Sequence, residues 1–128
     1  MTGTTRLTAL RYVLIATGLI FIFGIAALVR LWPAGWSWGA GSHYLPMILG
    51  VYAILGVFLI LASRDPVANR SLIWFTVWSS VVHAVIMAGM ASADPAMRGH
   101  LLGDVPALLL VAGALAILTP SARVVSPG

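Results

Sequence analysis

Four long apolar runs, separated by short polar stretches, dominate the pattern along the chain. They cover residues 10–31, 44–62, 72–91 and 101–118. Each approaches the roughly 20 residues that an α-helix needs to cross the hydrocarbon core of a bilayer. The stretches between them are rich in Gly, Pro, Ser, Asp and Arg, which interrupt helices or favour water. The pattern therefore predicts an all-α fold, a transmembrane four-helix bundle, in a single membrane domain over residues 1–128.

Asp-Pro pairs mark two of the expected helix starts. Asp65 and Asp94 suit the N-cap position, and Pro66 and Pro95 suit the first helical turn that follows. We therefore expect the third and fourth helices to begin before their apolar runs. Pro106 would then lie inside the fourth helix and kink it.

The composition agrees with a lipid environment. Of the 128 residues, 61% are hydrophobic and 8% are charged, whereas a soluble domain carries about 25% charged residues. So few charges could not cover a surface that faces water. The absence of cysteine excludes disulfides, thiolate metal sites and cysteine nucleophiles.

The net charge of +4 comes from seven Arg and three Asp, with no Lys or Glu. The arginines stand singly between the apolar runs, which indicates a role in membrane topology and not in binding nucleic acid. Five lie on the side of the termini and two on the other: Arg6, Arg11, Arg64, Arg70 and Arg123, against Arg30 and Arg98. The bias predicts that both termini are cytoplasmic.

Aromatic residues gather between the first and second runs. This short connection contains Trp32, Trp36 and Trp38, and Tyr44 follows just beyond it. Trp and Tyr favour the boundary between lipid and water, so we expect an aromatic belt at the outer interface. A ligand cage is the alternative interpretation.

His83 lies near the middle of the third run, where an ionisable group is costly unless it faces protein or water. The residues spaced three or four apart around it should share one inward face: Thr76, Ser79, Ser80, Met87 and Met90.

Two interpretations of this face remain open. In the structural one, the hydroxyls bond across helices and His83 is a neutral side chain paired with a neighbour such as Tyr52, at a similar depth. In the functional one, His83 is a ligand or a proton-handling group.

A second polar pair lies near the outer end of the fourth run. His100 and Asp104 are four residues apart and should share a helix face. They could form a local salt bridge at a helix start that favours negative charge. Alternatively, they could belong to a polar outer pocket together with His43 and Tyr44.

Metal or haem binding is a further alternative. His43 and Met47, and likewise His83 and Met87, are spaced i, i+4. Imidazole with thioether suits Cu(I) or an axial haem pair. Coincidence explains this spacing more simply in a chain with five Met, so we expect no cofactor.

No catalytic motif stands out. The chain has no Gly-rich phosphate loop, no HExxH and no plausible Ser-His-Asp arrangement. We therefore expect no catalytic residues. The size and span number also resemble small multidrug transporters, but the membrane-embedded glutamate on which those proteins rely is missing.

Three stretches carry a closer resemblance. They are SHYLPMILGVYAILGVFLILASRDP at residues 42–66, RSLIWFTVWSSVVHAVIM at 70–87 and RGHLLGDVPALLL at 98–110. The chain resembles a family of small bacterial four-helix integral membrane proteins of unknown function, similar in layout to the DoxX-like group. The resemblance implies the four-helix fold and a multi-pass location in the bacterial cytoplasmic (inner) membrane, and it transfers no activity.

The main functional hypothesis is a non-catalytic membrane protein with a polar pocket open to the outer side. Because four short spans expose much apolar surface to the lipid bilayer, we expect a homo-oligomer or an accessory subunit of a larger membrane complex. One alternative is small-molecule or ion binding or transport, using His83, Tyr52, His100 and Asp104. Another is a metal or haem redox subunit, using His83 and Met87.

Overall fold

The computed structural model describes residues 2–32 and 41–121, and within these ranges the secondary structure is helical, without strands. Four helical stretches are long and apolar enough to cross a membrane. The elements in chain order are α1 (Gly3–Leu19), η1 (Ile20–Gly24), α2 (Ile25–Leu31), α3 (Tyr44–Ala62), α4 (Arg70–Ala93), η3 (Pro95–Leu101) and α5 (Asp104–Leu118). The predicted transmembrane four-helix fold is confirmed. Trp36, Trp38 and Arg123 lie outside the described residues.

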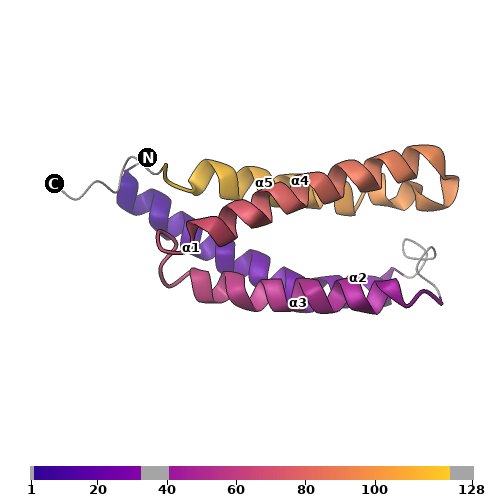
Figure 1. Cartoon of the computed structure of the whole chain (residues 1–128), viewed down its shortest axis with the longest axis horizontal. Helices are drawn as coiled ribbons and strands as arrows, with labels where there is room; N and C mark the ends of the chain where they lie inside the picture. Colours follow the sequence, from indigo (N-terminus) through magenta and orange to yellow (C-terminus); the bar gives the residue numbers. More distant parts are fainter. Residues whose placement is uncertain (1, 33–40, 122–128) are drawn as a thin grey trace.

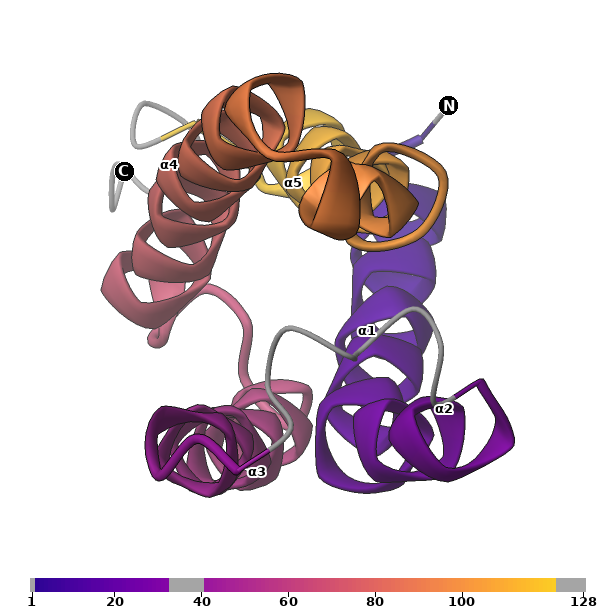
Figure 2. The same cartoon turned by 90° about the vertical axis from the view of Figure 1, so that its right-hand side faces the viewer.

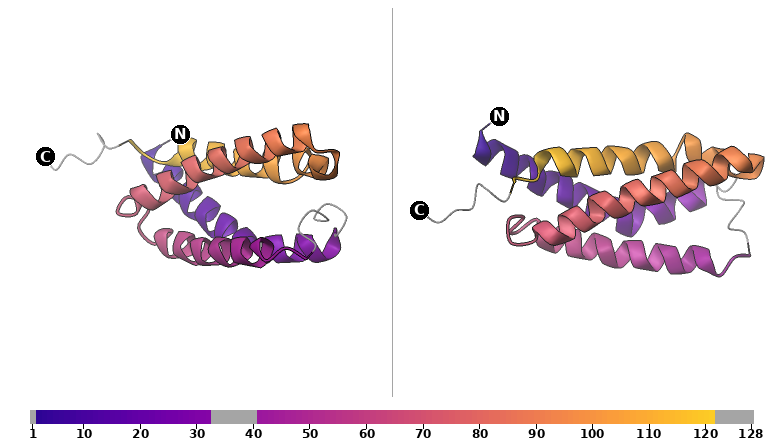
Figure 3. Two further views of the ribbon diagram at one scale, coloured as in Figure 1. Left: turned by 45° about the vertical axis from the view of Figure 1, so that its right-hand side comes forward. Right: turned by 45° about the horizontal axis from the view of Figure 1, so that its top comes forward.

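The four spans form two helix pairs. α1, η1 and α2 make one continuous span that packs along α3, while α4 packs along α5 (Figure 1). The start of α1 also contacts α5, so the pairs meet at the end of the molecule where α1 begins and α5 ends; we call this the terminal end. Toward the other end, which we call the opposite end, the pairs diverge (Figure 3).

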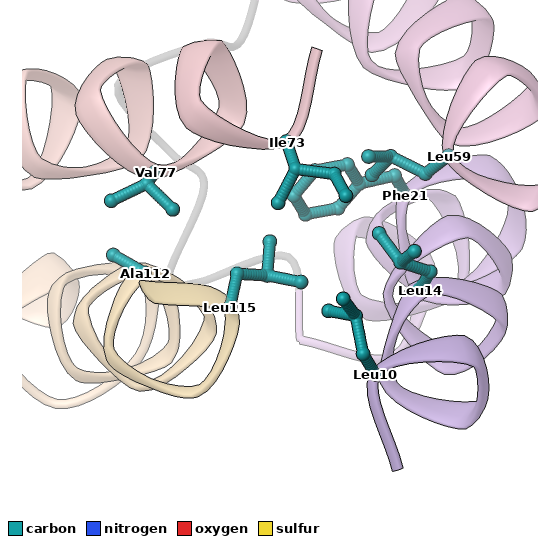
Figure 4. Packing of buried hydrophobic residues seen from close by; sticks show 8 residues of the cluster. All are labelled: Leu10, Leu14, Phe21, Leu59, Ile73, Val77, Ala112 and Leu115. Atoms are coloured by element: carbon teal, nitrogen blue, oxygen red, sulfur yellow. The ribbon is translucent and has the colours of Figure 1, made fainter. Parts of the chain in front are cut away.

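The hydrophobic core lies toward the terminal end. Leu10 and Leu14 of α1 meet Leu115 of α5, Ile73 of α4 and Leu59 of α3, and all five side chains are fully buried (Figure 4). All four spans contribute to this cluster, which closes the terminal end of the bundle.

The outer surface of the bundle is apolar. Phe23, Phe75 and Trp78 expose 67%, 61% and 63% of their surface, and many aliphatic side chains do the same. So many large exposed apolar groups would be costly in water but suit contact with lipid. The fold and the surface together identify a multi-pass integral membrane protein.

Arg6 connects the first span to the last by hydrogen bonds. Its Nε donates to the carbonyl of Leu118 at 3.1 Å, and one terminal nitrogen donates to the carbonyls of Ile117 and Thr119 at 2.5 and 3.1 Å. The last carbonyls of a helix lack donors within the helix, so the guanidinium caps the end of α5. The sequence assigned Arg6 a role in topology only.

The two Asp-Pro pairs behave differently from each other. Asp94 accepts a hydrogen bond from the backbone N–H two residues on at 2.9 Å, and so caps η3 as expected. Asp65 instead closes a turn, and α4 begins later, at Arg70. The fourth span changes from a 3-10 helix to an α-helix before Asp104. Pro106 therefore lies in the first turn of α5, where its missing N–H costs little, and the expectation that it lies deep in a helix begun at Pro95 is wrong.

Candidate functional site

A cavity of about 370 Å³ lies among the four spans, on the side of the opposite end. Its lining comes from the segments 20–28, 45–52, 83–87 and 103–111. Most of these residues are aliphatic, and the polar exceptions are Tyr52, His83 and Asp104. Figure 2, seen from the opposite end, shows α4 and α5 on one side of the molecule and the first span with α3 on the other.

A π-helical turn shapes one wall of the cavity. The backbone N–H of Ile25 donates to the carbonyl of Ile20, which makes η1 a wider turn between α1 and α2. This turn places Phe21 in a buried position, where it is 4% exposed. Its ring lies edge-to-face against the ring of Tyr52, and the two ring centroids are 4.9 Å apart. Phe21 therefore restricts the orientation of the Tyr52 ring.

Tyr52 and His83 connect the two helix pairs. The hydroxyl of Tyr52, on α3, is hydrogen-bonded to Nδ1 of His83, on α4. Both residues are half-buried and both line the cavity. The pairing expected from their similar depth is confirmed, and it provides a polar partner for a histidine in the middle of a span.

The Tyr52–His83 hydrogen bond leaves other hydrogen-bonding groups of the two side chains available to a ligand. A neutral imidazole and a phenol together carry two polar hydrogens, one of which occupies the bond between them. If the tyrosine donates, the Nε2–H of His83 remains as a donor and the phenol oxygen as an acceptor. If the histidine donates, the phenol O–H and Nε2 take those roles. In either tautomer the pair retains one donor and one acceptor.

The rest of the α4 face largely follows the expected pattern. Thr76, Ser80 and Met87 are buried, as predicted, whereas Met90 is 44% exposed and does not belong to the inward face. The hydroxyl of Thr76 donates to the carbonyl of Leu72 in its own helix at 2.9 Å. The hydrogen bond across helices that we expected from this threonine is therefore wrong, because the nearer backbone carbonyl takes its donor.

His100 and Asp104 form the predicted pair. Nδ1 of His100 lies 2.7 Å from Oδ2 of Asp104, and the two side chains are 2% and 16% exposed. The pair joins η3 to the first turn of α5, where a carboxylate also interacts well with the helix dipole. Asp104 also contributes to the cavity wall.

His43, another residue of the expected outer pocket, does not line the cavity. His43 is the exposed N-cap residue of α3, and Met47 beyond it is 63% exposed. Among His43, His100 and Asp104, only Asp104 is in the cavity lining. The structure therefore does not gather the three on one surface.

Two of the residues considered for metal or haem binding do lie together. His83 and Met87 are one turn apart on α4, and both line the cavity. Within residues 2–32 and 41–121, no three His, Cys, Asp or Glu side chains are grouped around a common point. The metal or haem alternative stays a prediction that rests on one imidazole and one thioether.

Phe21 and the π-helical turn are parts of the site that the sequence did not reveal. They fall within the stretch IFIFG, where every residue except the glycine is large and apolar. In such a stretch neither hydropathy nor helical spacing distinguishes a residue that faces a cavity from one that faces lipid.

Comparison with known proteins yields one match. A model of a family of unknown function, DUF6632, matches residues 4–128. No curated protein and no solved structure matches the chain. The expected resemblance to a small four-helix family of unknown function is thereby confirmed.

Proposed function

The chain belongs to the DUF6632 family, whose function is unknown, and we propose a function for it from the geometry of its cavity. The protein is a non-catalytic integral membrane protein that binds a small, mainly apolar molecule between its two helix pairs. One observation carries the proposal: a cavity of about 370 Å³ with aliphatic walls contains the Tyr52–His83 pair. Ligand pockets typically measure about 300–1,000 Å³ and combine apolar walls with a few polar groups.

The polar groups of the cavity limit the chemistry of the ligand. The Tyr52–His83 pair offers one donor and one acceptor, which suits a hydroxyl, carbonyl or amide group. A charged ligand group would be costly among aliphatic walls at this depth. Asp104, the one acidic residue among the described lining residues, already has a partner in His100, 2.7 Å away.

The arginine bias adds an orientation to this proposal. With both termini in the cytoplasm of a bacterium, the terminal end faces inward across the cytoplasmic membrane. The cavity would then lie in the outer half of the bilayer.

Photoaffinity labelling tests the binding function. A diazirine derivative of dodecanol, added to the protein in lipid nanodiscs, should form adducts on peptides of the cavity wall, and unlabelled dodecanol should compete. Ala107→Trp, which fills the cavity, should reduce these adducts by about tenfold, the factor that corresponds to about 1.4 kcal/mol of steric cost.

Leu109→Trp is the matched control for this experiment. It places the same side chain on α5 at a position that is 47% exposed and does not line the cavity, so labelling should persist. Equal labelling of the wild type and Ala107→Trp would contradict the binding function.

Self-association or docking to a larger membrane complex is a second proposal, compatible with the first. It is supported by the low burial of the spans: between 17% and 33% of the most apolar window of each span is buried within one copy. Much helix surface is therefore available to other helices. Cross-linking in native membranes, followed by sizing in detergent, tests this role. A monomer without a co-purifying protein would contradict it.

A further inference from the structure

A second hollow, of about 390 Å³, lies on the other side of the Tyr52–His83 pair. Its lining is Tyr44, Met47, Ile48, Val51, Tyr52 and His83. Tyr44, Met47 and Val51 are 72%, 63% and 69% exposed, so this groove opens onto the apolar outer surface of the bundle. We call it the lateral groove.

The lateral groove and the cavity share three residues. Ile48, Tyr52 and His83 line both. The groove involves α3 and α4, which belong to different helix pairs and have a small interface compared with those of α1 with α3 and α4 with α5. The Tyr52–His83 hydrogen bond therefore stands between a space inside the bundle and a surface that faces lipid.

We infer that the cavity receives its ligand sideways from the bilayer, between α3 and α4, and that the ligand is a neutral, single-chain, lipid-soluble molecule. The inference rests on the proposed binding function and deepens it by naming the ligand class and its route. The groove residues include no acidic side chain and no Arg, which suits the passage of an alkyl chain.

The depth of the Tyr52–His83 pair supports a neutral head group. Tyr52 is eight residues beyond Tyr44, the first residue of α3, which corresponds to about 12 Å of helical rise. That depth is within a hydrocarbon core of about 30 Å, away from both interfaces. A charged lipid head group would remain at the interface, whereas a hydroxyl or carbonyl can reach the pair and exchange hydrogen bonds with it.

The lack of native cysteine allows a direct test of the route. Met87→Cys places a thiol on the cavity wall, and Ser92→Cys places one at an exposed polar position at the opposite end, beyond the third apolar run. In nanodiscs, dodecylmaleimide should modify the thiol at position 87. The charged reagent sulfonatoethyl methanethiosulfonate should modify that thiol about a hundredfold more slowly than the one at position 92, because a charge is costly in an apolar interior.

A groove variant separates the lateral route from other routes. Val51→Trp, combined with Met87→Cys, should slow the reaction with dodecylmaleimide by about tenfold, since the indole obstructs the groove. Val57→Trp is the control, because this residue is 43% exposed on the same helix but is outside the groove. Equal rates in the two tryptophan variants would overturn the lateral route.

Rapid modification of the thiol at position 87 by the charged reagent would also overturn it, because the cavity would then open to water. Dodecanol photolabelling that persists in that case would leave the binding function standing. If Ala107→Trp and Leu109→Trp were instead photolabelled to the same extent, that result would contradict the binding function itself. The two failures are therefore distinguishable.

Discussion

Gly18 of α1 and Gly56 of α3 bring these two helices into backbone contact. A Cβ atom built on either glycine would lie 2.6 Å from the carbonyl oxygen of the other, closer than real Cβ contacts come. Small residues allow membrane helices to approach closely enough for favourable packing. The contact directly precedes the π-helical turn, so it holds α1 and α3 together beside the cavity.

Alanine at either glycine should force α1 and α3 apart. We expect Gly18→Ala and Gly56→Ala each to lower the free energy of unfolding by about 1–3 kcal/mol, the usual cost of overpacking. The midpoint of thermal unfolding in detergent, followed by circular dichroism, measures this loss. Gly50→Ala is the control, because nothing lies within 4 Å of its added Cβ. A loss at Gly50 equal to that at Gly56 would contradict the packing role.

Arg6 should stabilise the junction of the first and last spans. Arg6→Gln removes a charged group that donates to three carbonyls at the end of α5. Hydrogen bonds that involve a charged group contribute about 1.5–3 kcal/mol, and we expect a loss of about that size. Hydrogen exchange at Leu118 and Thr119 should accelerate as well. Arg6→Lys should recover part of the stability, because ammonium keeps the charge but lacks the planar fork.

Arg11→Gln provides the matched control for Arg6. Arg11 has the same charge and is on the same helix, but it is exposed and makes no hydrogen bond to a described residue. Its replacement should leave the unfolding midpoint unchanged. If both variants lost the same stability, the effect would be one of overall charge and not of the cap.

The Tyr52–His83 hydrogen bond should be measurable as a coupling energy between the two residues in a double-mutant cycle of stability. Tyr52→Phe and His83→Leu each break the bond, and the double variant should lose less stability than the sum of the two single variants. Hydrogen bonds between membrane helices average about 0.6 kcal/mol, with a maximum of about 1.7. Tyr12→Phe, at a 70% exposed tyrosine, is the control and should change nothing. Strict additivity would mean that the two residues do not interact in the folded protein.

His100 and Asp104 should matter for the start of α5. Asp104→Leu removes the carboxylate that lies 2.7 Å from a buried imidazole, and we expect it to cost about 1–3 kcal/mol of stability. Asp104→Asn keeps an acceptor oxygen at the same place and should cost less. Thermal unfolding of both variants measures the difference. If the asparagine variant were the less stable of the two, the hydrogen bond would not be the important part of this contact.

Hydropathy alone predicted most of the fold, because the bilayer imposes length and apolarity on every span. The bounds of α3, Tyr44–Ala62, coincide with the second apolar run. Helical rise also placed Tyr52 and His83 at one depth, and the structure joins them by a hydrogen bond. The start of α1 at Gly3 was harder to predict, because its first residues are polar and extend the helix beyond the apolar run.

The cavity could not be predicted, because it depends on which helices pair. Gly18 and Gly56 are far apart in the sequence, and neither is part of a G-x-x-x-G motif. Nothing local to either glycine indicates that it meets the other. Likewise, His100 belongs to the 3-10 helix η3 and not to α5, yet it still contacts Asp104, four residues later. The pair was therefore predicted correctly although the helix was not.

The proposed orientation can be measured with single cysteines in the native membrane. The described residues contain four candidate spans, so we expect the start of the first and the end of the last to lie on one side of the membrane, and the arginine bias predicts that this side is cytoplasmic. In bacterial spheroplasts, a charged thiol reagent should modify Ser92→Cys at the opposite end, where the native serine is exposed. It should modify Thr4→Cys only after the membrane is permeabilised. The reverse pattern would place the termini outside and the cavity in the inner half of the bilayer.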